Sequence, residues 1–237
     1  IARASARPPS SRSAARSRPP PAEIAADADS RMPARTSRTS ISGHVKPGSV
    51  APHDDAVTDE IATSRRPMAC AALATAGSRF AHLLRMVSDP TRLSVGFWNV
   101  GETAAHVASS ATFFLAVARG EKKPERLDEV AANNAAFLAS DPERDLLTLA
   151  DRFEVGEREL LAYVDSVEND PILELFEGAQ VPLSTLLAVE LGEVIVHGFD
   201  IARVSGLNWR IPRNEAAIAA GGMLPLLPHV VNREAAA

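Results

Sequence analysis

The sequence has little of what stabilises small secreted domains, β-sheets or membrane proteins. Cys70 is the only cysteine among 237 residues, which excludes an internal disulfide and fits a reducing cytoplasm. Aromatic residues make up only 5% of the chain while Ala is abundant, which favours packed helices over a sandwich or barrel. No run approaches 18 apolar residues, so we expect no membrane span. Together these absences indicate an all-α, cytoplasmic protein.

Composition divides the chain in two. Residues 1–66 are rich in Arg, Ser, Pro and Ala and predict a disordered extension. This extension has a charge of +4 (11 basic, 7 acidic), against −9 for residues 67–237 (14 basic, 23 acidic). It has no aromatic residues between its basic ones, so we expect no nucleic-acid partner. The remainder predicts one helical domain over 67–232 and a short C-terminal end at 233–237.

Apolar residues recur at helical spacing through the second part of the chain. Asn99 is expected to cap the second helix with Glu102 reaching back to it, and Asp141-Pro142 to begin the fourth. Gly206 is expected to end the helix that follows Pro182. The long helices predict an up-and-down four-helix bundle. Besides the helix after Pro182, the predicted helices span about 69–87, 100–119, 127–140, 142–168 and 213–224.

The helix LLAVELGEVIVHGFDIAR carries Glu193, His197 and Asp200 within an apolar run. Offsets of four and seven place the three side chains within about 60° of arc on one face. A carboxylate and an imidazole one turn apart can bind a divalent metal. Burial would also require a partner for each group, so a Glu–His hydrogen bond without metal is the alternative.

Glu190 also lies on this face, and both Glu190 and Asp200 must be compared with Glu193 as possible metal ligands. At about 1.5 Å per residue, Glu190 lies roughly 10.5 Å along the axis from His197 and Glu193 roughly 6 Å, so Glu193 is the better ligand. Asp200 lies about 4.5 Å from His197 along the axis. We interpret it as a residue that orients a metal ligand and does not bind the metal itself. The alternative is an ion pair of Asp200 with Arg203 at i,i+3.

Two segments together resemble the metal-binding N-terminal domain of the mycothiol-dependent maleylpyruvate isomerase family, in the DinB-like superfamily. The shared features are Trp98 followed eight residues later by His106, the Glu193-xxx-His197 pair, and the continuation His-Gly-Phe-Asp. The resemblance extends over roughly 68–232. The segments are FWNVGETAAHVASSATFFLAVARG at 97–120 and PLSTLLAVELGEVIVHGFDIARVSGLNW at 182–209.

The resemblance implies a DinB-like four-helix bundle with Zn²⁺, or another divalent metal, held by His106, Glu193 and His197. For His106 the alternative is a core histidine satisfied by Glu102 or by a backbone carbonyl. Three protein ligands leave an open position on the metal, as in catalytic sites. In the family this position receives the thiol of mycothiol as cosubstrate. The implied function is a mycothiol-dependent isomerase or thiol S-transferase whose metal activates the thiol for addition to an electrophile such as maleylpyruvate.

The resemblance also implies a cationic group in the site, because maleylpyruvate is an anionic dicarboxylate. The predicted bundle offers Arg203, Arg79 and Arg85, and we predict Arg203 as the catalytic one. The expected partners are a small-molecule thiol and an electrophilic substrate, with no nucleic acid and no membrane. The alternative function is a non-catalytic metal-binding or interaction bundle. A closed metal site or the absence of a pocket would favour that alternative.

Overall fold

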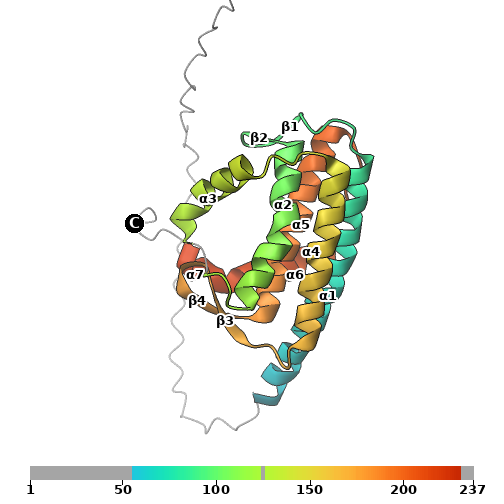
Figure 1. Cartoon of the computed structure of the whole chain (residues 1–237). Helices are drawn as coiled ribbons and strands as arrows, with labels where there is room; N and C mark the ends of the chain where they lie inside the picture. The colour runs from blue at the N-terminus through green and yellow to red at the C-terminus, as the bar shows by residue number, and fades with distance from the viewer. Residues whose placement is uncertain (1–54, 124–125, 231–237) are drawn as a thin grey trace, which may run out of the picture. The chain divides into compact units, whose positions relative to one another are not determined.

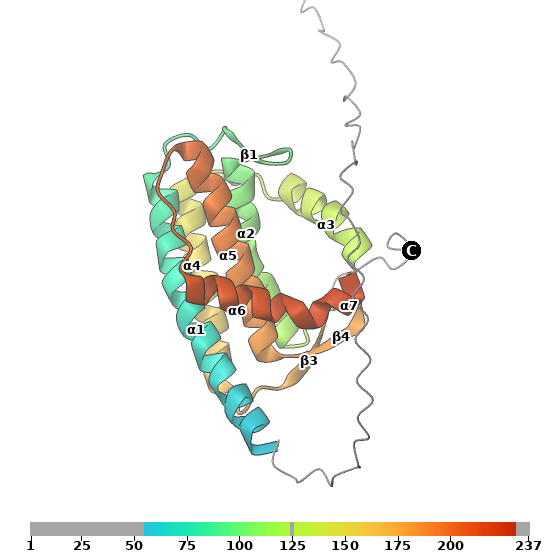
Figure 2. The same cartoon turned by 180° about the vertical axis from the view of Figure 1, so that it is seen from behind.

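The computed structural model describes residues 55–123 and 126–230, which are mostly helical with two small antiparallel sheets (Figure 1). Four long helices lie side by side: α1 contacts α4 and α5, and α2 contacts the same two helices. Both views show this arrangement, with α6 crossing behind the four helices in Figure 1 and in front of them in Figure 2. The long helices are α1 (Asp55–Met86), α2 (Val100–Ala118), α4 (Leu146–Ser166) and α5 (Leu183–Ser205).

The shorter elements surround these helices. Helix α3 lies beside α2, while α6 packs on α5 and α1. The shorter helices are α3 (Leu127–Ser140), η1 (Phe176–Gly178), α6 (Arg213–Met223), η2 (Leu224–Leu226) and α7 (Leu227–Val230).

In the described part of the chain, no helix is both long and apolar enough to cross a membrane.

Two connections contain hairpins that helical spacing did not predict. Strand β1 (Leu93–Val95) pairs with β2 (Trp98–Asn99), and β3 (Ile172–Leu175) pairs with β4 (Ala179–Pro182). Gly96 and Gly178 have φ values of 54° and 77° at the two turns, a conformation that glycine adopts without steric cost. The strands are too short to show a period of two in the sequence.

The core is formed by the predicted apolar stripes. Phe80 of α1 and Phe153 of α4 are fully buried and meet edge to face, with ring centroids 5.0 Å apart. Aliphatic side chains from all four long helices fill the space around these rings. The buried aliphatic residues of α1 and α4 include Leu73, Ala76, Leu83, Leu84, Leu146, Leu149, Leu160 and Val164.

Helix ends follow local hydrogen bonding. The predicted cap of α2 is confirmed: the Asn99 N–H donates to Glu102 Oε2 and the Glu102 N–H donates to Asn99 Oδ1, both at 2.8 Å. Helix α5 ends at Gly206, with φ 69°, as predicted. The predicted start of α4 at Asp141 is wrong. Asp145 caps the helix instead, accepting from the Thr148 N–H at 2.9 Å, because Asp141 accepts hydrogen bonds within its own loop.

The domain boundaries stay predictions. The predicted extension over residues 1–66 lies mostly outside the described residues, and residues 55–66 form the beginning of α1. The predicted C-terminal end at 233–237 also lies outside the described residues.

A buried acid lies where α4 packs on α1. The Glu157 side chain is 8% exposed, and its Oε1 has no hydrogen-bond partner. It fits because α1 has a glycine there: a Cβ on Gly77 would lie 1.8 Å from Glu157 Oε1. Burial, with the charge of Glu154, raises the pKa of Glu157 to about 8. The carboxyl is therefore mostly protonated at neutral pH.

We predict that Glu157→Gln stabilises the protein increasingly as the pH rises. Because the folded pKa is raised, the stability that Glu157 contributes is fully present below its ordinary pKa of 4.5 and is lost as the pH rises through about 8. The variant cannot ionise there, so its free energy of unfolding should exceed that of the wild type by about 1–3 kcal/mol at pH 8. The difference should shrink towards pH 5.

Urea denaturation between pH 5 and 8.5 measures this difference. Glu159→Gln is the matched control, since Glu159 is exposed on the same helix. An advantage for Glu157→Gln that is the same at every pH would contradict a protonated carboxyl.

Candidate metal centre

Three predicted ligands from two helices meet at one point. His106 lies on α2, two turns after the Asn99 cap, and Glu193 and His197 lie one turn apart on α5. Glu193 Oε2 is 3.1 Å from His106 Nε2 and 3.3 Å from His197 Nε2. One nitrogen or oxygen from each residue lies within 4.8 Å of the other two. We call His106, Glu193 and His197 the triad.

The triad has the size and chemistry of a divalent metal site. Zinc binds imidazole nitrogen and carboxylate oxygen at about 2.0–2.2 Å, so neighbouring ligands on a tetrahedron lie roughly 3.3 Å apart. The two contacts of Glu193 Oε2 match that separation. They are also the lengths of hydrogen bonds between imidazole and carboxylate. The donor set of two imidazoles and one carboxylate is one that a divalent metal such as zinc accepts.

The ionisation of Glu193 suits the same role. Burial raises its pKa, but hydrogen bonds with His106 and His197 outweigh burial and lower the pKa to about 2. For His197 burial lowers the pKa, and the carboxylates of Glu193 and Asp200 together outweigh it, so that its pKa is raised. A carboxylate that is already ionised at neutral pH does not have to lose a proton before it binds a metal.

Glu190, one turn before Glu193 on α5, is more deeply buried and its pKa shifts in the opposite direction. Its side chain is fully buried, one oxygen accepts a hydrogen bond from Ser110 Oγ at 2.9 Å, and the other has no partner. Burial raises its pKa well above the ordinary value. Glu190 is not part of the triad, as the distance along the helix predicted.

Asp200 lies beside the outer nitrogen of His197. Its Oδ2 is 3.4 Å from His197 Nδ1, a long contact, and that nitrogen has no other partner. The alternative pairing with Arg203 is not found among the described residues. A carboxylate at this position orients an imidazole whose other nitrogen faces a metal.

Arg203 lies outside the cavity beside the triad. It is exposed in the last turn of α5, and its guanidinium donates to the Ser94 carbonyl of β1 at 3.2 Å. The other two candidate arginines are also engaged: Arg79 pairs with Glu215, and Arg85 pairs with Asp151 and Glu154. The catalytic role predicted for Arg203 gains no support from this placement.

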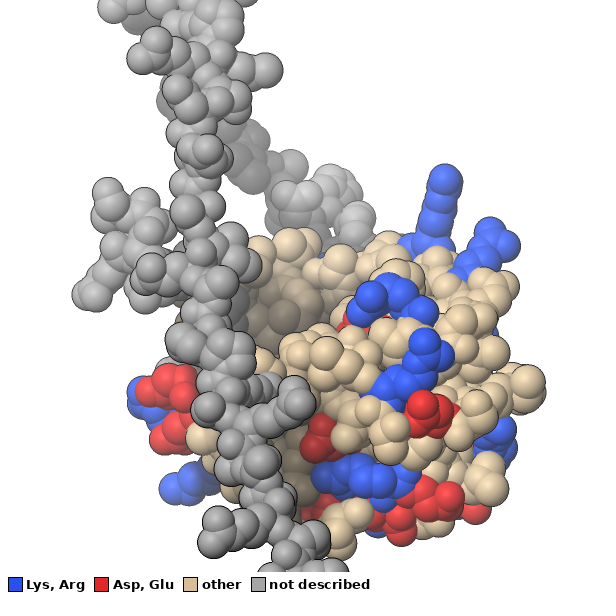
Figure 3. Space-filling model, turned by 90° about the horizontal axis from the view of Figure 1, so that it is seen from above, with Lys and Arg blue, Asp and Glu red and all other residues tan. Residues whose placement is uncertain are grey.

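A cavity of about 1170 Å³ opens beside the triad. Its walls come from α2, the two lysines that follow it, α3 and the β1–β2 hairpin, with one residue each of α4 and η1 and two of α5. A recess is visible in the surface on this side of the molecule (Figure 3). Trp98 of β2 packs on the triad, with its ring centroid 5.0 Å from that of His106 and 6.4 Å from that of His197.

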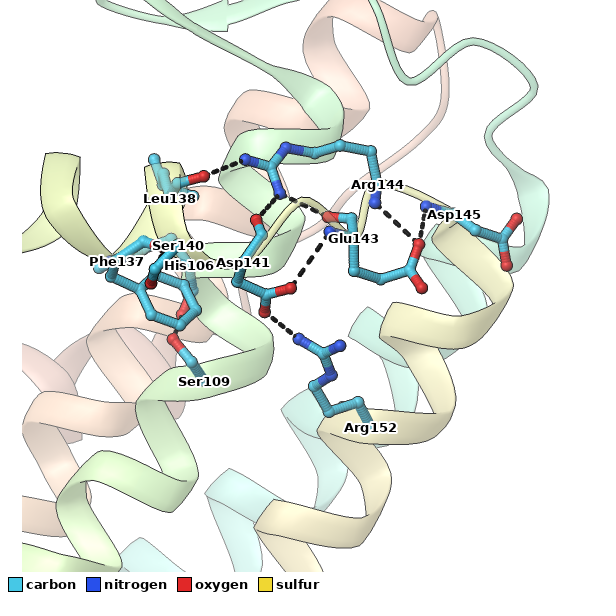
Figure 4. Close-up of polar contacts among 10 residues, drawn as sticks. All are labelled: His106, Ser109, Phe137, Leu138, Ser140, Asp141, Glu143, Arg144, Asp145 and Arg152. Atoms are coloured by element: carbon cyan, nitrogen blue, oxygen red, sulfur yellow. Dashed lines mark hydrogen bonds and ion pairs between the residues drawn. The ribbon is translucent and has the colours of Figure 1, made fainter.

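The cations that line the cavity, Arg152, Lys122 and Lys123, were not predicted from the sequence. Arg152 of α4 lines the cavity, and its guanidinium pairs with Asp141 in the loop between α3 and α4 (Figure 4). Arg144 supports the same loop by donating to the carbonyls of Asp141 and Leu138 at 2.7 and 2.9 Å. Asp141 and Arg152 are eleven residues apart, and no helical spacing relates them.

One family of known proteins matches the part of the chain that contains these residues. The family described as the mycothiol maleylpyruvate isomerase N-terminal domain matches residues 71–202, which is 132 of the 237 residues. The chain belongs to this family. No curated protein and no solved structure matches it. The part that matches the mycothiol maleylpyruvate isomerase family contains the whole triad and Asp200, while Arg203 lies just beyond it.

Within this family domain, the residue after His197 has a packing role. Gly198 is buried against the Trp209 indole: a Cβ on Gly198 would lie 2.4 Å from the ring. The indole N–H donates to the Ile195 carbonyl at 3.0 Å, so the ring is held in place. The close approach of Trp209 to α5 therefore requires glycine beside His197.

We predict that Gly198→Ala destabilises the protein by about 1–3 kcal/mol, because the indole must move to admit the methyl group. Gly192→Ala on the same helix is the matched control, since a Cβ there meets no atom within 4 Å. That substitution should be neutral or stabilise by up to about 1 kcal/mol, since alanine favours the helix. Urea denaturation measures both, and equal stabilities of the two variants would refute the tight packing.

Proposed function

We propose that the triad binds Zn²⁺ or another divalent ion, and that this domain serves a mycothiol-dependent isomerase or thiol S-transferase. In this proposal α1, α2, α4 and α5 form a DinB-like four-helix bundle. The observation that carries it is the position of Glu193 Oε2 between imidazole nitrogens of two different helices. Family membership supports the same assignment.

The cavity favours an enzyme over a non-catalytic metal-binding or interaction module. His106, Glu193 and His197 all line it, so a fourth position on the ion would face open space and not packed side chains. Three protein ligands and one exchangeable position are the arrangement of catalytic zinc. A structural site would be closed by a fourth protein ligand.

The nucleophile in this proposal comes from a cosubstrate. Burial raises the pKa of the Cys70 thiol, and Cys70 does not line the cavity, so this thiol is poorly suited to attack. Zinc held by the triad would stabilise the thiolate of mycothiol over its thiol at neutral pH. A reducing cytoplasm would keep such a thiol available.

The chain's own residues hold and orient the site. Glu193 contributes a negative charge at neutral pH, and Asp200 would orient His197 from the side of Nδ1 and leave Nε2 for the metal. Trp98 covers the ring of His106 and excludes water from that side. In the isomerase reaction, the thiolate would add to the cis double bond of maleylpyruvate, and the resulting single bond would rotate. Elimination would then release the trans isomer and the thiolate.

We predict that the purified protein binds about one zinc ion per chain, and that His197→Ala lowers its zinc affinity more than about 100-fold. Metal analysis and calorimetric titration with zinc measure this. Mycothiol should then bind to the metal-loaded wild type and not to His197→Ala.

His82→Ala is the matched control, because His82 is exposed on α1 and lies outside the triad. It should keep the zinc affinity of the wild type. Circular dichroism checks that all three proteins are folded. Equal zinc affinity of His197→Ala and the wild type, or no zinc bound at saturating concentration, would refute the site.

A further inference from the structure

Two adjacent lysines line the same cavity at a distance from the triad. Lys122 and Lys123 follow the end of α2, where the Lys122 N–H donates to the Ala116 carbonyl at 3.2 Å. The Lys122 ammonium lies 4.9 Å from the centre of the Phe113 ring. Phe113 is seven residues beyond His106 on α2, about 10.5 Å along the helix axis. The positive charge therefore lies about two helical turns from the triad.

The other charged groups of the cavity have partners. Glu193 is held by two imidazoles, Arg152 pairs with Asp141, and Glu129 lies 3.9 Å from the guanidinium of Arg126. The two lysines form no ion pair with any described residue. Three cations and two carboxylates line the cavity, although residues 67–237 carry a net charge of −9. This end of the cavity is thus a local positive region on an acidic protein.

The surroundings suit a charged ligand that extends along the cavity. Ser109 and Thr112 of α2 line the wall between the triad and the lysines, and Asn134 of α3 also lines the cavity. Hydroxyl and amide groups there can hydrogen-bond the middle of an elongated molecule. A charged group near Lys122 would then belong to a molecule whose other end lies at the triad.

We propose that Lys122 and Lys123 form an anion-binding site that holds the carboxylate of an elongated acidic electrophile while its other end reacts beside the triad. The site would supply the cationic partner that Arg203, Arg79 and Arg85 do not. The identity of the ligand as the electrophile rests on the proposed function. Anion binding by the two lysines does not, because it requires no metal.

The test compares the double variant Lys122→Met/Lys123→Met with Arg119→Met in the full chain. Arg119 carries the same charge near the same turn, but it lies over the Tyr163 ring and outside the cavity. The probe is adipate, a flexible dicarboxylate, with its uncharged dimethyl ester as the control ligand. Calorimetry or NMR titration measures the dissociation constants at low and moderate salt.

We expect the double variant to bind adipate about tenfold more weakly than the wild type, since charge-assisted hydrogen bonds are lost. Arg119→Met should stay within about twofold of the wild type, because surface charges at a distance are screened. Adipate affinity of the wild type should fall with added salt, and binding of the ester should not respond to the substitutions. Equal adipate affinity in all three proteins, or no adipate binding to the wild type, would overturn the proposal.

Two further measurements separate this site from the metal site. His197→Ala retains both lysines, so with zinc removed from both proteins it should bind adipate as the wild type does. Failure of the anion site would leave zinc binding unchanged, and failure of the metal site would leave adipate binding unchanged. If the double variant lost affinity for mycothiol and kept its affinity for adipate, the lysines would serve the thiol, and the proposal would be overturned.

Discussion

The site depends on the charge of one carboxylate. An ionised Glu193 inside a helical protein is costly unless other groups compensate its charge, and two imidazoles do so at 3.1 and 3.3 Å. Because His106 belongs to α2 and His197 to α5, this interaction also sets how the two helices meet. The Asn99 cap fixes where α2 begins, and so which of its faces His106 occupies. Trp98, immediately before that cap, packs over the imidazole rings.

Three residues of the His-Gly-Phe-Asp segment on α5 point in different directions and make different contacts. His197 faces the triad, Gly198 faces the Trp209 indole, and Asp200 lies beside the outer nitrogen of His197. Substitution of Gly198 would therefore act on packing and not on the ligands themselves. Phe199 is 46% exposed, and the described structure shows no task for it.

What the sequence predicted correctly is local or periodic. The Asn99 cap depends on residues three apart, and the Glu193–His197 pair on residues one turn apart, so both can be read directly from spacing. The hairpins were missed because their strands are too short to show alternation. Arg203 was expected on or near an inward face of the bundle, yet it does not line the cavity. Arg152 joins the cavity from α4, and only the packing of α4 on α2 brings it there.

The contrast between Glu190 and Glu193 shows why one carboxylate of α5 suits a metal and the other does not. They are one turn apart on one helix, but Glu190 is fully buried while 31% of the Glu193 side chain is exposed. Glu190 receives one hydrogen bond from a neutral hydroxyl, which does not offset burial, so its pKa is raised. Glu193 has two imidazoles as partners, which lower its pKa to about 2. A metal ligand must be deprotonated, and the two histidines favour the ionised form of Glu193 while burial favours the neutral form of Glu190.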